Sequence, residues 1–158
     1  MMNSTMRFVS AAFAMLAISQ PAVAENIAYA STPNGPFWFG TLTQHLPLTA
    51  GGATTVRFNN PKAGLVSITF SADCQVIAAT TAVMNIDIFI DNQIVDITNG
   101  DDALCAGRGV NVEGGWARHT FPVAKSLVAG VHAVRVDAAV RAVHNGARLD
   151  NITILVQR

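Results

Sequence analysis

Hydrophobic and polar residues alternate with a period of two along several short stretches of this 158-residue chain. In residues 65–70, LVSITF, the side chains of Val66, Ile68 and Phe70 share one face. The same spacing aligns the isoleucines of residues 85–90, NIDIFI, and those of residues 151–156, NITILV. Such alternation is typical of half-buried strands that place one face on a core. The pattern therefore predicts β-strands.

Turn signals separate these runs. Asn59-Asn60-Pro61 precedes Gly64, and Asp91-Asn92 lies between two apolar runs, as in a two-residue hairpin. Short strands at this spacing predict an all-β chain, an antiparallel, jelly-roll-like β-sandwich. The expected strands lie near residues 37–48, 54–59, 64–71, 74–79, 84–90, 93–97, 116–123, 131–140 and 148–157.

One segment, residues 130–146, GVHAVRVDAAVRAVHNG, is compatible with two structures. Its alanines would suit a helix that ends at Asn145-Gly146. Its valines at 134, 136 and 140 fit a period of two, and β-branched residues favour strands. We therefore expect a strand here.

The first 24 residues form a separate unit. A single cation, Arg7, precedes an apolar run from Phe8 to Ile18, and small residues close the segment at Ala22-Val23-Ala24. This is the arrangement of a cleaved secretory signal peptide. The apolar run is too short to cross a bilayer, which needs about 20 residues. We expect residues 1–24 to be removed, leaving 25–158 as a single secreted or periplasmic domain with no transmembrane segment.

The charge of the mature chain excludes some partners. Without Arg7 it carries nine cations against ten acids, and no basic cluster is present. Such a chain lacks the electrostatic footprint of a protein that binds nucleic acid or an anionic membrane.

Both cysteines, Cys74 and Cys105, lie in the exported part. An even pair in an oxidising compartment predicts one disulfide. A metal site or a catalytic thiol is the alternative, but the C-x-x-C spacing that would favour it is absent.

No enzyme signature is present, and we expect a protein that is not an enzyme and binds no cofactor. The sequence has no G-x-S-x-G elbow, P-loop or dinucleotide fingerprint. The acids of residues 96–102 miss the register of an EF-hand. The histidines are scattered, and His132 alternates with valines, which predicts a place at the rim of a core face; they are His45, His119, His132 and His144.

Four segments together resemble jelly-roll carbohydrate-binding modules. The segments are GLVSITFSADC, MNIDIFIDNQIVD, WARHTFPVAKSLVAGVHAVRV and ARLDNITILV, within residues 64–156. The resemblance implies a non-catalytic domain that recognises a glycan or another surface ligand. It also implies that Asp150, in the last strand, helps to hold a structural calcium ion with acids near the N-terminus, where Glu25 is the sole acid before Asp73.

Three of the nine aromatic residues beyond position 24, Phe37, Trp38 and Phe39, stand in a row. In an extended segment, neighbouring side chains point to opposite faces, so one core cannot accommodate all three. The outward side chains, with Trp116 as a second candidate, are predicted to form a ligand-binding platform. Two alternatives stay open: these side chains complete the core, or they form an interface in a homo-oligomer or a structural subunit of a cell-surface complex. The low proportion of charged residues, 13%, favours the subunit.

Overall fold

The computed structural model describes residues 24–33, 35–77, 82–95, 103–107, 116–141 and 146–158. Within these ranges the chain forms eleven strands. Residues 1–23 of the predicted signal peptide, the acids of residues 96–102 and His144 lie outside the described residues. No described segment forms a helix of the length and hydrophobicity that a bilayer crossing requires.

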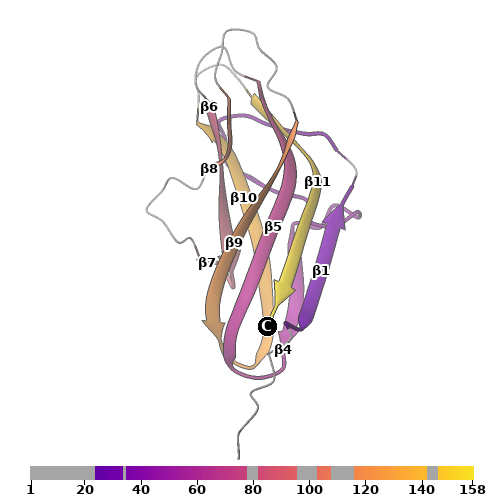
Figure 1. Ribbon diagram of the computed structural model, residues 1–158, viewed down its shortest axis with the longest axis vertical. Coiled ribbons are helices and arrows are strands. Elements are labelled where there is room, and N and C mark those ends of the chain that lie inside the picture. The colour runs from indigo at the N-terminus through magenta and orange to yellow at the C-terminus, as the bar shows by residue number, and fades with distance from the viewer. Residues whose placement is uncertain (1–23, 34, 78–81, 96–102, 108–115, 142–145) are drawn as a thin grey trace, which may run out of the picture.

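The strands form two antiparallel sheets, which confirms the predicted β-sandwich. In sheet A the spatial order is β1-β11-β5-β9, and β2 also pairs with β11. Figure 1 looks onto this sheet, with β10 and β6 of the second sheet behind it. The strands of sheet A are β1 (Asn26–Thr32), β2 (Phe37–Phe39), β5 (Gly64–Ile77), β9 (Ala117–Leu127) and β11 (Gly146–Gln157).

Sheet B lies behind sheet A and is centred on β10 and β6. Strands β3 and β4 pair with β10, and β7 and β8 pair with β6. Its strands are β3 (Gln44–His45), β4 (Thr55–Asn60), β6 (Ala82–Ile90), β7 (Gln93–Ile94), β8 (Ala103–Gly107) and β10 (Gly130–Arg141). The ambiguous valine-rich segment is thus a strand over its described residues, as expected.

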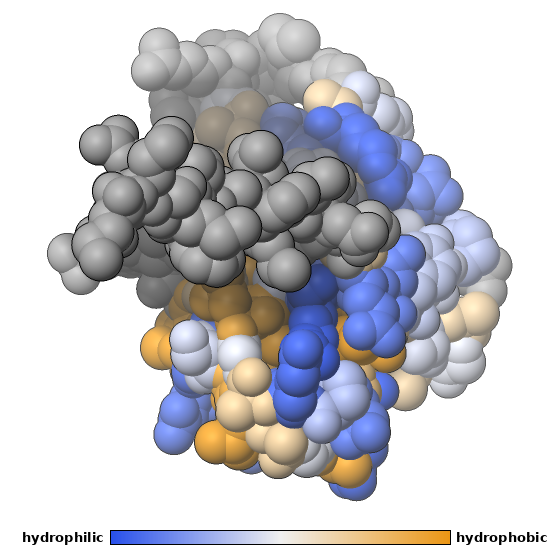
Figure 2. Space-filling view, turned by 60° about the horizontal axis from the view of Figure 1, so that its bottom comes forward, coloured by the Kyte–Doolittle hydropathy of each residue, from blue (hydrophilic) through white to orange (hydrophobic). Residues whose placement is uncertain are grey.

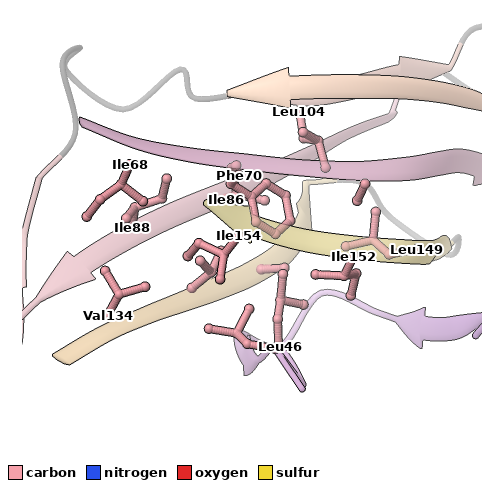
Figure 3. Packing of buried hydrophobic residues seen from close by; sticks show 14 of the residues in the cluster. Leu46, Ile68, Phe70, Ile86, Ile88, Leu104, Val134, Leu149, Ile152 and Ile154 are labelled. Atoms are coloured by element: carbon pink, nitrogen blue, oxygen red, sulfur yellow. The ribbon is translucent and has the colours of Figure 1, made fainter. Parts of the chain in front are cut away.

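The alternating apolar residues form the core between the two sheets. Ile68 and Phe70 of β5 and Ile154 of β11 face Ile86 and Ile88 of β6, and all five are completely buried (Figure 3). Since each fully buried aliphatic side chain contributes about 1.5–3 kcal/mol, this interior is the main source of stability. The period of two therefore determines both the strands and the face that each one buries.

The predicted hairpin at Asp91-Asn92 is confirmed. Phe89 pairs with Ile94 and Ile90 with Gln93, so two residues connect β6 to β7. Both turn residues have positive φ, 51° and 64°, as the mirror-image turns of two-residue hairpins require.

Four strand predictions need correction. The expected strand at 37–48 is two short strands, β2 and β3, in different sheets. The expected strand at 64–71 and the described part of the one at 74–79 are a single long strand, β5. Strand β8, which contains Cys105, and strand β1 were not predicted. The alternation of apolar and polar residues is hard to recognise in β1 and β8, because small residues such as Ala and Ser occur on buried and exposed faces alike.

The disulfide between Cys74 and Cys105 is present and joins β5 of sheet A to β8 of sheet B. The two cysteines are 31 residues apart in sequence. Closing a loop of this length stabilises the folded state by about 3–4 kcal/mol in the chain-entropy model. The bridge therefore holds the two sheets together at one end of the sandwich.

At the other end, a buried histidine joins two turns. The side chain of His132 is 7% exposed and packs against Phe58, with 5.6 Å between ring centroids. Nδ1 of His132 lies 2.7 Å from Oδ2 of Asp91, and Nε2 lies 3.0 Å from the carbonyl oxygen of Val128. Both partners are acceptors, so the imidazole satisfies both only when it is doubly protonated.

These contacts shift two pKa values in opposite directions. The hydrogen bond to Asp91 raises the pKa of His132, the Val128 carbonyl adds to the rise, and burial opposes it. Burial favours a higher pKa for Asp91, but hydrogen bonds with His132 and the amide of Ala133 outweigh it, and the pKa is lowered. The folded state therefore favours the ionised pair.

The free energy of unfolding should depend on pH accordingly. The contribution of the pair is complete between the ordinary pKa values of 3.8 and 6.5. It is lost as pH rises through the folded pKa of His132, and as pH falls through that of Asp91. Urea unfolding followed by tryptophan fluorescence should show that His132→Gln costs about 1–3 kcal/mol at pH 5 and flattens the decline above pH 6.5.

The matched variant His119→Gln, at a histidine outside this network, should leave the pH profile unchanged. A decline above pH 6.5 that persists in His132→Gln would contradict this assignment.

Candidate functional site

The aromatic triplet of β2 is divided between the core and the surface. Phe39 is 3% exposed and belongs to the core, and Phe37 is half-buried against it. Trp38 points the other way and is 55% exposed. Of the three predicted platform residues, Trp38 alone lies on the surface, and Phe39 is excluded because β2 alternates like the other strands.

Trp38 lies on the outer face of sheet A and is stacked on an arginine. It pairs with Arg148 of β11, whose guanidinium carbon lies 3.8 Å from the centroid of the indole ring. A guanidinium over an aromatic face is an attractive cation–π contact, which holds both planes in place. The indole is therefore fixed on one side by Arg148.

The second predicted residue, Trp116, lies near the same end of this sheet. It directly precedes β9, whose first residue, Ala117, pairs with Cys74 of β5. Trp116 is two residues from Arg118, which contacts β11 across the outer face, so in an extended run the two side chains share this face. Trp116 is 44% exposed. The structure thus brings Trp38 and Trp116, 78 residues apart in sequence, to one face.

A third aromatic side chain, Tyr29, was not predicted as a site residue. It lies on β1, pairs with Leu155 of β11 and is 65% exposed. The prediction missed it because β1 itself was missed. The sequence signal for β1 is that Ile27, Tyr29 and Ser31 alternate with alanines, as the residues of an edge strand can.

A hollow of about 310 Å³, lined by both apolar and polar groups, lies beside Tyr29. Its lining comes from β1, the segment after it, β9 and β11, and consists of Tyr29, Ser31, Pro33, Arg118, Asn151, Ile152 and Thr153. Arg118 crosses from β9 toward β11: Nη1 donates to the carbonyl oxygen of Asn151 at 3.2 Å, and Nη2 donates to Oγ1 of Thr153 at 3.0 Å. Nη1 also lies 3.4 Å from Oδ1 of Asp73. The guanidinium is thus held in one orientation.

A β-bulge in β11 shapes the hollow. The pairing of β11 with β5 shifts register between Asp150 and Thr153, and Asn151 has a φ of 48°. The side-chain amide of Asn151 donates to Oδ2 of Asp73 at 2.7 Å, and its backbone N–H donates to Oδ1 of Asp150 at 2.7 Å. Bulges re-aim side chains where a strand passes a site. Here the bulge brings Asn151 into the polar cluster with Arg118.

The calcium expectation rests on Asp150, which lies in β11. Glu25, the proposed partner, pairs with Arg158 at the opposite end of β11 from Asp150. Both oxygens of the neighbouring Asp73 already accept hydrogen bonds from protein donors. Among the described residues, no three His, Cys, Asp or Glu side chains gather as metal ligands. Structural calcium therefore stays a prediction from the resemblance.

The histidine–carboxylate pairs of the described chain lie elsewhere. Nδ1 of His45 in β3 lies 2.7 Å from Oδ1 of Asp137 in β10, both in sheet B. His132 and Asp91 lie at one end of the sandwich. No hydroxyl or thiol of the described residues is hydrogen-bonded to either histidine. The outer face of sheet A instead combines exposed rings with fixed polar groups, which is an arrangement for binding.

A separate group of exposed apolar side chains lies at the turns below the two sheets, namely Leu65, Val128 and Val131. Figure 2 brings this end forward and shows hydrophobic patches interrupted by hydrophilic residues. The aromatic face of sheet A is thus distinct from these scattered apolar residues.

No family model and no curated protein matches the chain. Among solved structures, it is similar to a family 35 carbohydrate binding module from Clostridium thermocellum, with 14% identity and a TM-score of 0.36 over 84% of this chain and 98% of the module. It is also similar to a structure of infectious bursal disease virus, strain Gx, with 11% identity and a TM-score of 0.46 over 86% of this chain and 31% of the viral one.

A third similar structure is a β-glucosidase from Paenibacillus barengoltzii, with 12% identity and a TM-score of 0.34 over 73% of this chain. This chain spans 11% of the length of that enzyme. All three neighbours have TM-scores below 0.5. At these identities and TM-scores they assign neither a function nor a site residue to this chain.

The position of β2 depends on a glycine. A Cβ atom added at Gly35 would collide with the carboxylate of Asp150 and come within 3.1 Å of its Cα atom. Gly35→Ala should therefore force the segment before Trp38 away from β11, at a cost of about 1–3 kcal/mol in thermal or urea unfolding. The control is Gly40→Ala at the other end of β2, where an added Cβ meets nothing within 4 Å. Equal stability of the two variants would contradict the close approach.

Proposed function

We propose that this chain is an exported, non-catalytic binding domain that recognises a glycan on the outer face of sheet A. The observation that carries the proposal is the presence of three exposed aromatic side chains, Tyr29, Trp38 and Trp116, on the same sheet face as a hollow that Tyr29 and Arg118 line. The predicted signal peptide and the disulfide support export, since disulfides persist in oxidising compartments.

Sugars present two kinds of surface, and this face offers a partner for each. The C–H faces of a pyranose ring are apolar and pack on flat aromatic rings. The hydroxyl groups need hydrogen-bonding partners, because an unpaired polar group in an interface loses its bonds to water. Arg118, Asn151 and Thr153 supply donors and acceptors beside Tyr29.

The polar groups are already ordered before a ligand arrives. Arg118 has five N–H donors, and its contacts with Asp73, Asn151 and Thr153 leave donor capacity toward the hollow. Side chains that are fixed in advance lose less conformational entropy on binding. The hollow is therefore pre-organised for a ligand rich in hydroxyl groups, such as a sugar.

The alternative of a structural subunit is less well supported by the same face. Aspartate is depleted at the centre of subunit interfaces, whereas Asp73 lies on this face beside Arg118. One edge of sheet A, strand β9, has Pro122 at its middle and Lys125 near its end. A proline or a lysine in an edge strand hinders its pairing with another chain, because proline lacks a backbone N–H and lysine is charged.

Binding to a glycan array, followed by affinity electrophoresis on the polysaccharides that bind, tests this function. Tyr29→Ala, Trp38→Ala and Trp116→Ala should each weaken binding about tenfold, since a lost stacked ring costs on the order of 1.4 kcal/mol. Ile94→Ala is the matched control, because Ile94 in β7 of sheet B is also 55% exposed, like Trp38.

Binding that is indifferent to all three aromatic substitutions would overturn the proposed site. A stable oligomer in light scattering that Trp38→Ala dissociates would favour the structural subunit instead.

A further inference from the structure

One cation on this face, Arg148, has no acidic partner among the described residues. Arg118 lies beside Asp73, and Arg135 on sheet B lies beside Asp137, but no described carboxylate is within ion-pair distance of Arg148. Nε of Arg148 is buried and has no hydrogen-bond partner within the described structure. Arg148 as a whole is half-buried, so its terminal Nη groups, and not Nε, are the donors that a ligand would contact.

The guanidinium is nevertheless held in place. It stacks 3.8 Å from the ring centroid of Trp38, on the strand next to its own. Stacking on an aromatic face fixes the plane of a guanidinium and leaves its in-plane N–H groups available. An arginine oriented in this way is suited to bind a carboxylate or a sulfate through two parallel hydrogen bonds.

The nearby acids are engaged by other groups. Oδ1 of Asp150 accepts from the backbone N–H of Asn151, and its carboxylate packs against Gly35. Asp73 accepts from Asn151 and Arg118. Neither acid forms an ion pair with Arg148, so a positive charge remains at the Trp38 end of the face.

We infer that Arg148 recognises the negatively charged group of an acidic sugar, a carboxylate or a sulfate, in the glycan bound by sheet A. The inference rests on the proposed function and specifies its substrate class. Arg148 pairs with Gln75 of β5, and Trp116 directly precedes β9, the next strand along. Two strand spacings separate Arg148 from Trp116, about 10 Å. A sugar stacked on Trp116 would thus place a neighbouring acidic unit near Arg148.

The test compares polysaccharides that differ only in charge. Polygalacturonate and its methyl ester share one backbone, as do dextran sulfate and dextran, so the two pairs distinguish carboxylate from sulfate. Affinity electrophoresis at constant ionic strength should show at least about tenfold tighter binding to the charged member of one pair. In Arg148→Gln this ratio should fall to about one, and in Arg148→Lys it should be intermediate.

Arg57→Gln is the control for non-specific attraction, because Arg57 is an exposed arginine on β4 of sheet B and should not affect the ratio. Equal affinity for charged and neutral members, with binding still sensitive to Trp116→Ala, would overturn this inference and leave the proposed function intact. A charged-to-neutral ratio that persists in Arg148→Gln would also overturn it. Absence of binding to every polysaccharide on the array would overturn the proposed function and this inference with it.

Discussion

Strand β11 determines both the interior and the surface of sheet A. It pairs with β1 and β2 along one edge and with β5 along the other. Its inward residues Leu149, Ile152, Ile154 and Val156 are completely buried, which leaves Arg148 and Thr153 no place except the outer face. A shift of register by one residue would exchange the two sets, so burial of the aliphatic side chains also fixes the site. The bulge at Asn151 is the local exception that turns an extra polar residue toward the hollow.

The sequence was sufficient for the fold class because local alternation and turn chemistry carried the information. The isoleucines of β6, the hairpin at Asp91-Asn92 and the cysteine pair each had a local signal, and each prediction is confirmed. The boundaries were less predictable. Nothing in residues 37–48 indicated that β2 and β3 belong to different sheets, because that depends on which long-range partner each segment finds.

The candidate site was predicted only in part, for a similar reason. Trp38 and Trp116 were recognisable as unusual aromatic residues, but their common face follows from the pairing of β2, β11, β5 and β9. The contacts of Arg118 with Asp73 and Thr153 join residues 45 and 35 positions apart. Such a network has no local pattern, and Tyr29 was hidden in a strand whose other residues are small. The proposed specificity for acidic sugars likewise depends on tertiary contacts, because Arg118 has a carboxylate beside it, whereas Arg148 has none among the described residues.

The most direct test uses the tryptophans themselves, since the chain has only two, Trp38 and Trp116. Protein labelled with 5-fluorotryptophan should give two ¹⁹F resonances, assigned with Trp38→Phe and Trp116→Phe, that report on opposite sides of the proposed face. Titration with the polysaccharide that binds tightest in affinity electrophoresis should shift both resonances with the same saturation. A polysaccharide that is clearly bound yet shifts neither resonance would contradict the assignment of glycan binding to the outer face of sheet A.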